Sequence, residues 1–388
     1  MRTFGVEEEL LLVDAATGYP LALADQVTRR ETVTSGAVVG TGARGPGHAN
    51  GQTAAGDADD EAPVHELQRE QVETGTAPCS SLDELAAQLA KRRASAAQAA
   101  RQTGAEVAAL ATSPLPVQPS VTLDERYVKM AELYAMTAQE QLTCGCHVHV
   151  GVASDDEGVA VLDRIRPWLP PLLALSANSP FWQGRDSGYS SYRRQVWGRW
   201  PSAGPTGLFG TPQAYHETID AILATGALLD EGMVYFDARL SRHYPTVEIR
   251  IADVCLEVGD AVLLASLTRA LVETAAREWR QGRPPSAVPA EVLRLAGWRA
   301  SRSGLDDELV HPVTGRPAPA EAVIRALVDH VGVALADFGG GPADATADLL
   351  ETVLARGNGA ASQRRVHEAT GDLAEVVRTA VARTLSIG

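Results

Sequence analysis

Three short segments of the chain alternate acidic, imidazole or guanidinium side chains with apolar residues. They are residues 4–13, 144–152 and 245–254. Successive side chains of a β-strand point to opposite faces, so each segment predicts a strand with one apolar and one polar face. Carboxylates bind hard divalent cations, and a guanidinium binds phosphate or carboxylate in a bidentate manner. If the strands lie in one sheet, their polar faces predict a concave, charged site.

The first segment places Glu7 and Glu9 on one face, about 7 Å apart at ~3.3 Å per residue. If that face is covered, the two carboxylates are costly to bury unless cations compensate them. A solvated edge strand could carry the same glutamates without any function, and this segment alone favours neither interpretation. The opposite face combines Glu8 with the apolar residues Phe4, Val6, Leu10 and Leu12.

The second segment places His147 and His149 on one face between two glycines, which leaves room for a ligand. A zinc hydrolase is a rival interpretation, because Cys144 and Cys146 lie close by in the sequence. Both cysteines belong to the opposite face, so one strand cannot offer all four side chains to one zinc ion.

The third segment places Glu248 and Arg250 opposite an apolar face of Val247, Ile249 and Ile251, with Ala252 expected on the polar side. An exposed ion pair is the alternative, worth under about 1 kcal/mol. A fourth acidic stretch, residues 65–76, adds Glu66, Glu70 and Glu73 without clean alternation.

The elements around these segments predict an α+β fold with a largely antiparallel sheet packed with helices. Strands are expected at 4–13, 66–74, 144–152 and 245–254, and helices at 81–104, 260–279, 320–336, 344–356 and 364–385. We interpret residues 1–388 as a single domain. Residues 35–62, with seven glycines and few bulky apolar side chains, are expected to form a flexible insertion.

Composition excludes several classes of function. The net charge of −15 argues against nucleic acid as a partner, but carboxylates can hold magnesium and so attract a nucleotide. The sequence contains no charge-free apolar stretch of about 18 residues, so we expect no membrane span. Four cysteines are too few for a disulfide scaffold, and three glutamates stand where a signal peptide needs apolar residues. We therefore expect a cytoplasmic protein that acts on small molecules. The sequence is also compatible with a homo-oligomer.

Together these motifs resemble the type 2 glutamate–cysteine ligases, also called carboxylate–amine ligases. The resemblance rests on Gly5-Val-Glu-Glu-Glu-Leu, on Cys144-Gly-Cys-His-Val-His-Val-Gly and on Thr246-Val-Glu-Ile-Arg-Ile-Ala-Asp. Residues 178–185, 191–201 and 357–364 are similar to the same family. The likeness covers nearly the whole chain except the 35–62 insertion, which is unusual for the family.

The resemblance implies a glutamine-synthetase-like sheet whose carboxylates hold Mg²⁺, or Mn²⁺, between ATP and an acid substrate. It implies that the metal ligands are Glu7, Glu9, Glu73, His147 and Glu248, with Arg250 as the catalytic guanidinium. The candidate nucleotide- or substrate-binding residues are Glu66, His149, Arg193 and Arg194.

The function implied is ATP-dependent joining of a carboxylic acid to an amine through an acyl phosphate. Glutamate is the expected acid, and the sequence leaves the amine open. Two further alternatives remain: a guanidino-kinase-like phosphotransferase, and a nucleotide-binding protein without turnover.

Overall fold

The computed structural model describes residues 2–34, 63–338 and 342–386. Residues 35–62, predicted to be an insertion, lie outside this part of the chain. Within it, seven strands form one antiparallel sheet in the order β2-β3-β1-β5-β9-β8, with β4 also paired to β1. The strands are β1 (Phe4–Asp14), β2 (Val64–His65), β3 (Gln71–Gly75), β4 (Ala105–Ala108), β5 (Gly145–Gly151), β8 (Ala238–Leu240) and β9 (Thr246–Asp253).

Three of the four predicted strands are confirmed, namely β1, β5 and β9. The prediction of a continuous strand over 66–74 is wrong. The chain forms β2, leaves the sheet for a turn, and returns as β3. In the turn, Leu67 and Arg69 bond through their backbones to Thr122 and Ser120 instead of to a neighbouring strand.

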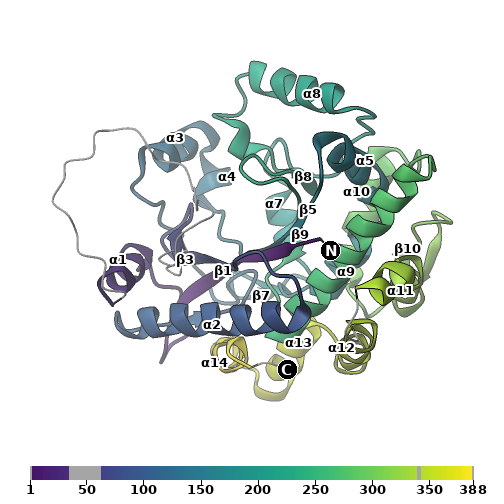
Figure 1. Ribbon diagram of the computed structural model, residues 1–388. Helices are drawn as coiled ribbons and strands as arrows, with labels where there is room; N and C mark the ends of the chain where they lie inside the picture. The colour runs from purple at the N-terminus through teal and green to yellow at the C-terminus, as the bar shows by residue number, and fades with distance from the viewer. Residues whose placement is uncertain (1, 35–62, 339–341, 387–388) are drawn as a thin grey trace.

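The apolar face of the sheet packs on helices α2 (Leu82–Arg101) and α9 (Val258–Arg280), and α2 lies beneath the sheet in Figure 1. Phe4, Val148 and Ile249 are fully buried in this core, as alternation predicts. The prediction that Ala252 lies on the polar face of β9 is wrong. An extra residue of β9 between Ile249 and Ala252 forms a bulge, so Ala252 pairs with Cys146 and belongs to the core.

The predicted helices are confirmed except for the last one. Helix α2 follows Ser81, whose side chain accepts a hydrogen bond from the Glu84 amide, and α9 contains the predicted 260–279. Helices α11 (Ala320–Asp337) and α12 (Pro342–Arg356) match the predicted 320–336 and 344–356. The predicted helix 364–385 is wrong, because Gly371 has a φ of 67° and ends α13 (Gly359–Thr370) before α14 (Leu373–Thr384).

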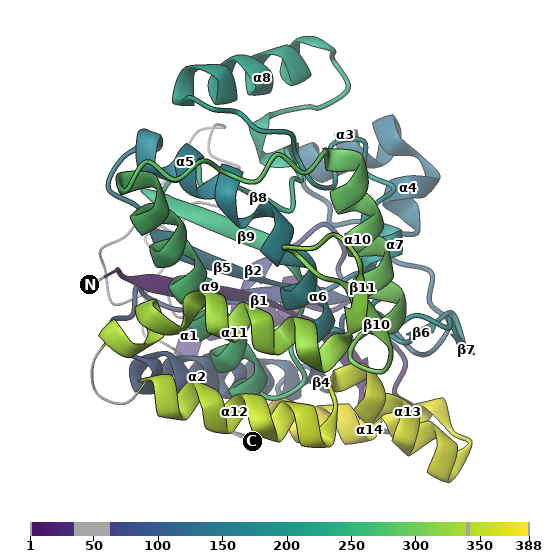
Figure 2. The same ribbon diagram turned by 90° about the vertical axis from the view of Figure 1, so that its right-hand side faces the viewer.

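The remaining elements surround this framework. Figures 1 and 2 show α8 on the side of the sheet opposite α2, while α11 and α12 lie on the side of α9. No helix in the described ranges is long and apolar enough to cross a membrane. The other elements are α1 (Ala24–Thr34), α3 (Glu125–Tyr134), α4 (Met136–Gln139), α5 (Asp155–Ile165), α6 (Leu169–Ser176), α7 (Arg193–Trp197), α8 (Pro212–Ala224), α10 (Ala290–Ser303), β6 (Phe181–Trp182), β7 (Arg185–Asp186), β10 (Glu308–Val310), β11 (Pro317–Pro319) and 3-10 turns at Arg166–Trp168 and Glu231–Met233.

A buried ion pair joins the sheet to α2. Glu8, on the apolar face of β1, accepts two hydrogen bonds from Arg93, at 2.8 Å from Nε and 2.6 Å from Nη2. Neither side chain has exposed surface. Arg93 also donates to the carbonyl oxygens of Leu256, Thr384 and Cys255, so one guanidinium connects β1, α2 and two distant parts of the chain.

We expect Arg93→Met to lower the free energy of unfolding by about 3–5 kcal/mol, because it leaves the Glu8 carboxylate buried without a cation. Arg101→Met is the matched control: this exposed arginine of the same helix pairs with Glu106, and its loss should cost less than about 1 kcal/mol. Urea denaturation of both variants measures the difference. Equal losses would contradict a structural role for the buried pair.

Candidate active site

The register of the sheet places the predicted charged residues beside one another. Glu7 of β1 is paired with His147 of β5, and His149 of β5 is paired with Glu248 of β9. Arg239 of β8 is paired with Glu248, so this row continues to the edge of the sheet. On the other side of β1, Glu9 is paired with Glu73 of β3. Strands far apart in the sequence therefore present their charged side chains on one face.

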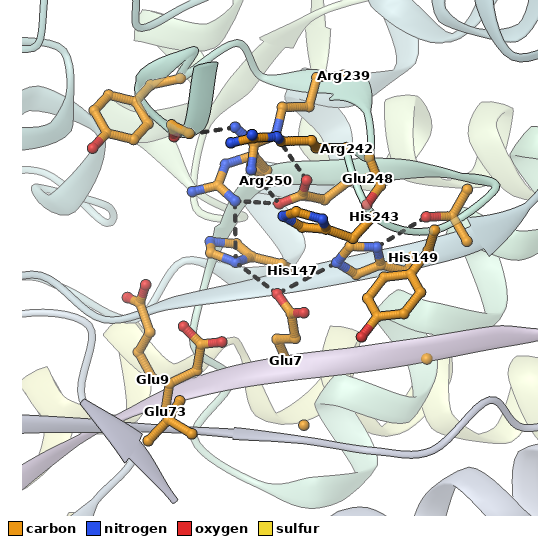
Figure 3. A pocket seen from close by; sticks show the side chains of 18 of the residues that line it. Glu7, Glu9, Glu73, His147, His149, Arg239, Arg242, His243, Glu248 and Arg250 are labelled. Carbon is orange, nitrogen blue, oxygen red and sulfur yellow. Dashed lines mark hydrogen bonds and ion pairs between the residues drawn. The ribbon is translucent and has the colours of Figure 1, made fainter. Parts of the chain in front are cut away.

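This face forms the floor of a pocket with a volume of about 1410 Å³. Eight of the predicted site residues line it: Glu7, Glu9, Glu66, Glu73, His147, His149, Glu248 and Arg250. Figure 3 shows Glu9 and Glu73 beside each other, at a distance from the group formed around Glu7 and Glu248.

The first group of side chains centres on Glu7. Its Oε2 lies 3.3 Å from Nε2 of His149 and 3.5 Å from Nδ1 of His147 (Figure 3). Glu7, His149 and Glu248 each offer a ligand atom, all within 4.8 Å of one another. The sequence prediction gave the ligand role to His147 and a substrate role to His149, whereas the geometry places His149 in the candidate metal cluster.

Electrostatics distinguish the two imidazoles. Burial opposes the protonation of His149, but the Glu7 carboxylate outweighs it and raises the pKa of His149. Burial and the nearby Arg250 guanidinium lower the pKa of His147 to about 4, so His147 is neutral at neutral pH. Burial opposes the ionisation of Glu7, but His149 and the hydrogen bonds from both imidazoles lower its pKa.

Two guanidinium groups hold Glu248. Arg239 donates from Nε to Glu248 Oε2 at 2.7 Å, and Arg250 donates to Oε1. Burial opposes the ionisation of Glu248, but Arg239 and Arg250 outweigh it and lower its pKa well below the ordinary value. The exposed ion pair considered for Glu248 and Arg250 is therefore wrong, because both side chains are buried.

The second group consists of carboxylates alone. Glu9, Glu66 and Glu73 offer oxygen atoms within 4.8 Å of one another. Burial and the charge of Glu66 raise the pKa of Glu9 to about 7, although Arg193 and the Gly145 amide lower it. Burial and the charges of Glu7 and Glu66 raise the pKa of Glu73 well above its ordinary value. When ionised, the group carries more negative charge than its protein neighbours neutralise, so its carboxyls hold their protons to a higher pH.

Arg193 and Arg194 do not line the pocket, although both are buried beside it. Arg194 forms an ion pair with Asp237, and Arg193 lies 3.9 Å from Asp253. Arg193 also passes close to β5 on the face that carries His147. A Cβ atom at Gly145 would lie 2.4 Å from Nη2 of Arg193, so this position has no room for a side chain.

Sequence reasoning missed several residues of the site. Arg239 is one, and the alternation of Ala238-Arg239-Leu240 was a signal for it, although a strand of three residues is short. The pocket is also lined by Gln68, Gln71 and Gln141 and by the aromatic residues Tyr127, Trp197, Trp200 and Tyr235, for which no spacing rule gave a signal.

Both groups suit divalent cations. Glu9, Glu66 and Glu73 offer hard oxygen ligands, and Glu7, Glu248 and His149 offer oxygens and one imidazole, which is the donor set of Mg²⁺ or Mn²⁺ rather than of a thiolate-bound metal. The uncompensated charge of the second group favours a cation there. The four cysteines are free and buried, and none lines the pocket, which disfavours the zinc interpretation.

Comparison with known proteins agrees with this geometry. The family model described as glutamate–cysteine ligase family 2 matches residues 3–379. The chain belongs to the glutamate–cysteine ligase family 2. Among its relatives, "Putative glutamate--cysteine ligase 2-1" of Streptomyces avermitilis is 54% identical over 99% of both chains. "Putative glutamate--cysteine ligase 2" of Streptomyces coelicolor is 52% identical, again over 99% of both.

Solved structures share the fold of this family member. A glutamate–cysteine ligase of Francisella tularensis, solved in complex with AMP, has a TM-score of 0.65 at 12% identity and covers 99% of this chain and 89% of its own. A bifunctional glutathione synthetase of Pasteurella multocida has a TM-score of 0.66 at 14% identity, covering 99% of this chain and 52% of its own. The predicted family and the α+β fold class, with an antiparallel sheet packed with helices, are confirmed.

The pKa of Glu9 leads to a prediction for the family member without bound metal. A carboxyl whose pKa is raised on folding keeps its proton to a higher pH, and a cation must displace that proton. We expect the Mn²⁺ affinity to rise by at least about tenfold per pH unit below pH 7, because Glu9 must lose its proton and Glu73, whose pKa is also raised, adds to the dependence. Calorimetric titration from pH 5.5 to 8.5 measures this, and Glu73→Gln should weaken binding at pH 8. An affinity independent of pH would contradict it.

Proposed function

We propose that this chain is an ATP-dependent carboxylate–amine ligase that activates an acid, with glutamate favoured, as an acyl phosphate and couples it to an amine. One observation carries the proposal: Glu7, Glu9, Glu73, His147, Glu248 and Arg250, from four strands, line one pocket in a member of the glutamate–cysteine ligase family 2. The names of the relatives and the AMP-bound structure of a protein with the same fold support ATP as the nucleotide.

The reaction needs activation because a carboxylate oxygen is a poor leaving group. In the first step a carboxylate oxygen attacks the γ-phosphorus of ATP, the bond from that phosphorus to the bridging oxygen breaks, and ADP leaves. In the second step the amine nitrogen attacks the acyl carbon and expels phosphate. The nitrogen loses its extra proton, and the products are an amide, ADP and phosphate.

The side chains of the pocket position and neutralise these charged groups. Bound divalent cations would supply charge neutralisation for the phosphates, held by Glu7, Glu248 and His149 in one group and by Glu9, Glu66 and Glu73 in the other, with His147 beside the first. Nη1 of Arg250 lies 3.5 Å from Nδ1 of His147. Its guanidinium is suited to the oxygens of the transferred phosphoryl group.

Product analysis separates the proposal from its rivals. The full chain is incubated with ATP, Mg²⁺, glutamate and a panel of amines, ADP release is measured, and products are identified by mass spectrometry. A ligase yields an amide and ADP only when both acid and amine are present. A phosphorylated amine without coupling would indicate the guanidino-kinase-like alternative, and ATP binding without ADP release would indicate a protein without turnover.

We expect Glu7→Gln to lower the ligation rate at least a hundredfold, because it removes a charge from the first candidate metal group. Thermal unfolding should change little, since the side chain is 30% exposed to the pocket. The matched control is Glu217→Gln on α8, outside the pocket, where Glu217 bonds only to exposed Gln213 among the described contacts. Retained turnover in Glu7→Gln would defeat the assignment of Glu7.

A further inference from the structure

Arg239, on the edge strand β8, contacts two different parts of the pocket with one guanidinium group. Its Nε donates to Oε2 of Glu248 at 2.7 Å, and its Nη2 lies 3.4 Å from Oε1 of the same carboxylate. The third nitrogen, Nη1, donates to the carbonyl oxygens of Val234 at 3.0 Å and Gly232 at 3.3 Å. A guanidinium presents its donors in a rigid planar fork, so these contacts fix the Glu248 carboxylate relative to the backbone at 232–234.

Residues 230–235, which we call the wall segment, form part of the pocket wall. Five of them line the pocket: Asp230, Glu231, Gly232, Val234 and Tyr235. Within the segment Glu231–Met233 form a 3-10 turn. Arg126 of α3 donates to both carboxylate oxygens of Asp230, at 2.7 and 3.0 Å, and the Ser202 hydroxyl bonds to the backbone beside the turn. The wall segment is therefore held from α3, from Ser202 and, through the guanidinium described above, from β8.

The same guanidinium also stands beside the first candidate metal group. Glu248 pairs with two guanidinium groups, those of Arg239 and Arg250 (Figure 3). It also offers a ligand atom within 4.8 Å of those of Glu7 and His149. A cation held by this group would meet two positive charges that already bind one of its ligands, and like charges repel. Arg239 therefore orients Glu248 and at the same time competes with a cation for it.

We propose that Arg239 is a positioning residue that joins Glu248 to the wall segment and lowers the cation affinity of the first candidate metal group. The inference rests on the proposed function and adds a residue to its machinery. Two substitutions separate the two roles. A lysine keeps the positive charge beside Glu248 but lacks the fork that donates to the carboxylate and to the two carbonyls together, whereas a methionine loses both the charge and the donors.

Binding of Mn²⁺ tests the charge role without turnover. Every chain carries Glu73→Gln, which impairs the second candidate group, and free Mn²⁺ is measured by electron paramagnetic resonance at pH 8. Arg239→Met should bind Mn²⁺ about tenfold more tightly than the parent, because a like charge and a competing donor are lost while Arg250 still holds Glu248. Arg239→Lys should stay within about twofold of the parent, because it keeps the charge. A purely structural role predicts the opposite, weaker binding by Arg239→Met.

Hydrogen exchange of backbone amides, followed by mass spectrometry of the full chain, tests the contact with the wall segment. The peptide that covers residues 230–235 should exchange about tenfold faster in both Arg239→Met and Arg239→Lys, because the segment loses hydrogen bonds from a charged donor. Exchange in α9 should not change, which shows that the fold is intact. Arg199→Met is the matched control: Arg199 pairs with Glu140 outside the pocket, and its loss should alter neither Mn²⁺ binding nor exchange of the segment.

Unchanged or weaker Mn²⁺ binding by Arg239→Met would overturn the proposal, and so would unchanged exchange of the wall segment in both variants. If Arg239→Met fails to fold, Arg239→Gln, which removes the charge and keeps a donor, replaces it in the binding test. ADP release separates these outcomes from the proposed function. A chain that shows both effects but releases no ADP keeps the positioning role and loses the ligase function. A chain that ligates and shows neither effect keeps the function and loses the role of Arg239.

Discussion

Repulsion between buried carboxylates is the constraint on which the rest of this structure depends. Glu7, Glu9, Glu73 and Glu248 lie on one face of a sheet, and burial of Glu9 and Glu248 limits the screening that water provides at a surface. The two halves of the site differ in how this repulsion is compensated. Arginines and histidines stabilise the ionised carboxylates near Glu248, whereas burial and neighbouring carboxylates raise the pKa values of Glu9 and Glu73 in the other half. One half is therefore a network of ion pairs, and the other is a carboxylate group that could hold a cation.

The opposite face of the sheet must be rigid for this arrangement to hold. Close apolar packing of β1 and β5 on α9, and of β9 on α6, keeps the strands in register, and the register decides which charged groups meet. The Glu8–Arg93 pair fixes β1 from below, directly between Glu7 and Glu9 in the sequence. Glycine at position 145 leaves room for the side chains of Arg193 and His147 on the same face of β5. The site is thus supported by residues outside the two candidate metal groups.

Much of this could be predicted because strand alternation is a local property. The faces of β1, β5 and β9 follow from the period of two, and so does the convergence of Glu7, His147 and Glu248 once the strands share a sheet. The failures have non-local causes. The 66–74 strand is interrupted because residues 67–69 bond to 120–122, a pairing with no sequence signal. The bulge that buries Ala252 and the partners of Arg194 depend on tertiary contacts in the same way.

Strands that are distant in the sequence must pair before the site is assembled during folding. Its four central contributors stand near positions 7, 73, 147 and 248, and the row is complete only when β1 is paired with β3 and β5 and β5 is paired with β9. Such distant pairings form late and slowly in folding. No proteolytic fragment that lacks the first fifteen residues would keep either group intact, because β1 supplies a carboxylate to both. Both halves of the pocket therefore depend on the amino-terminal strand, and loss of this strand would remove a carboxylate from each of them.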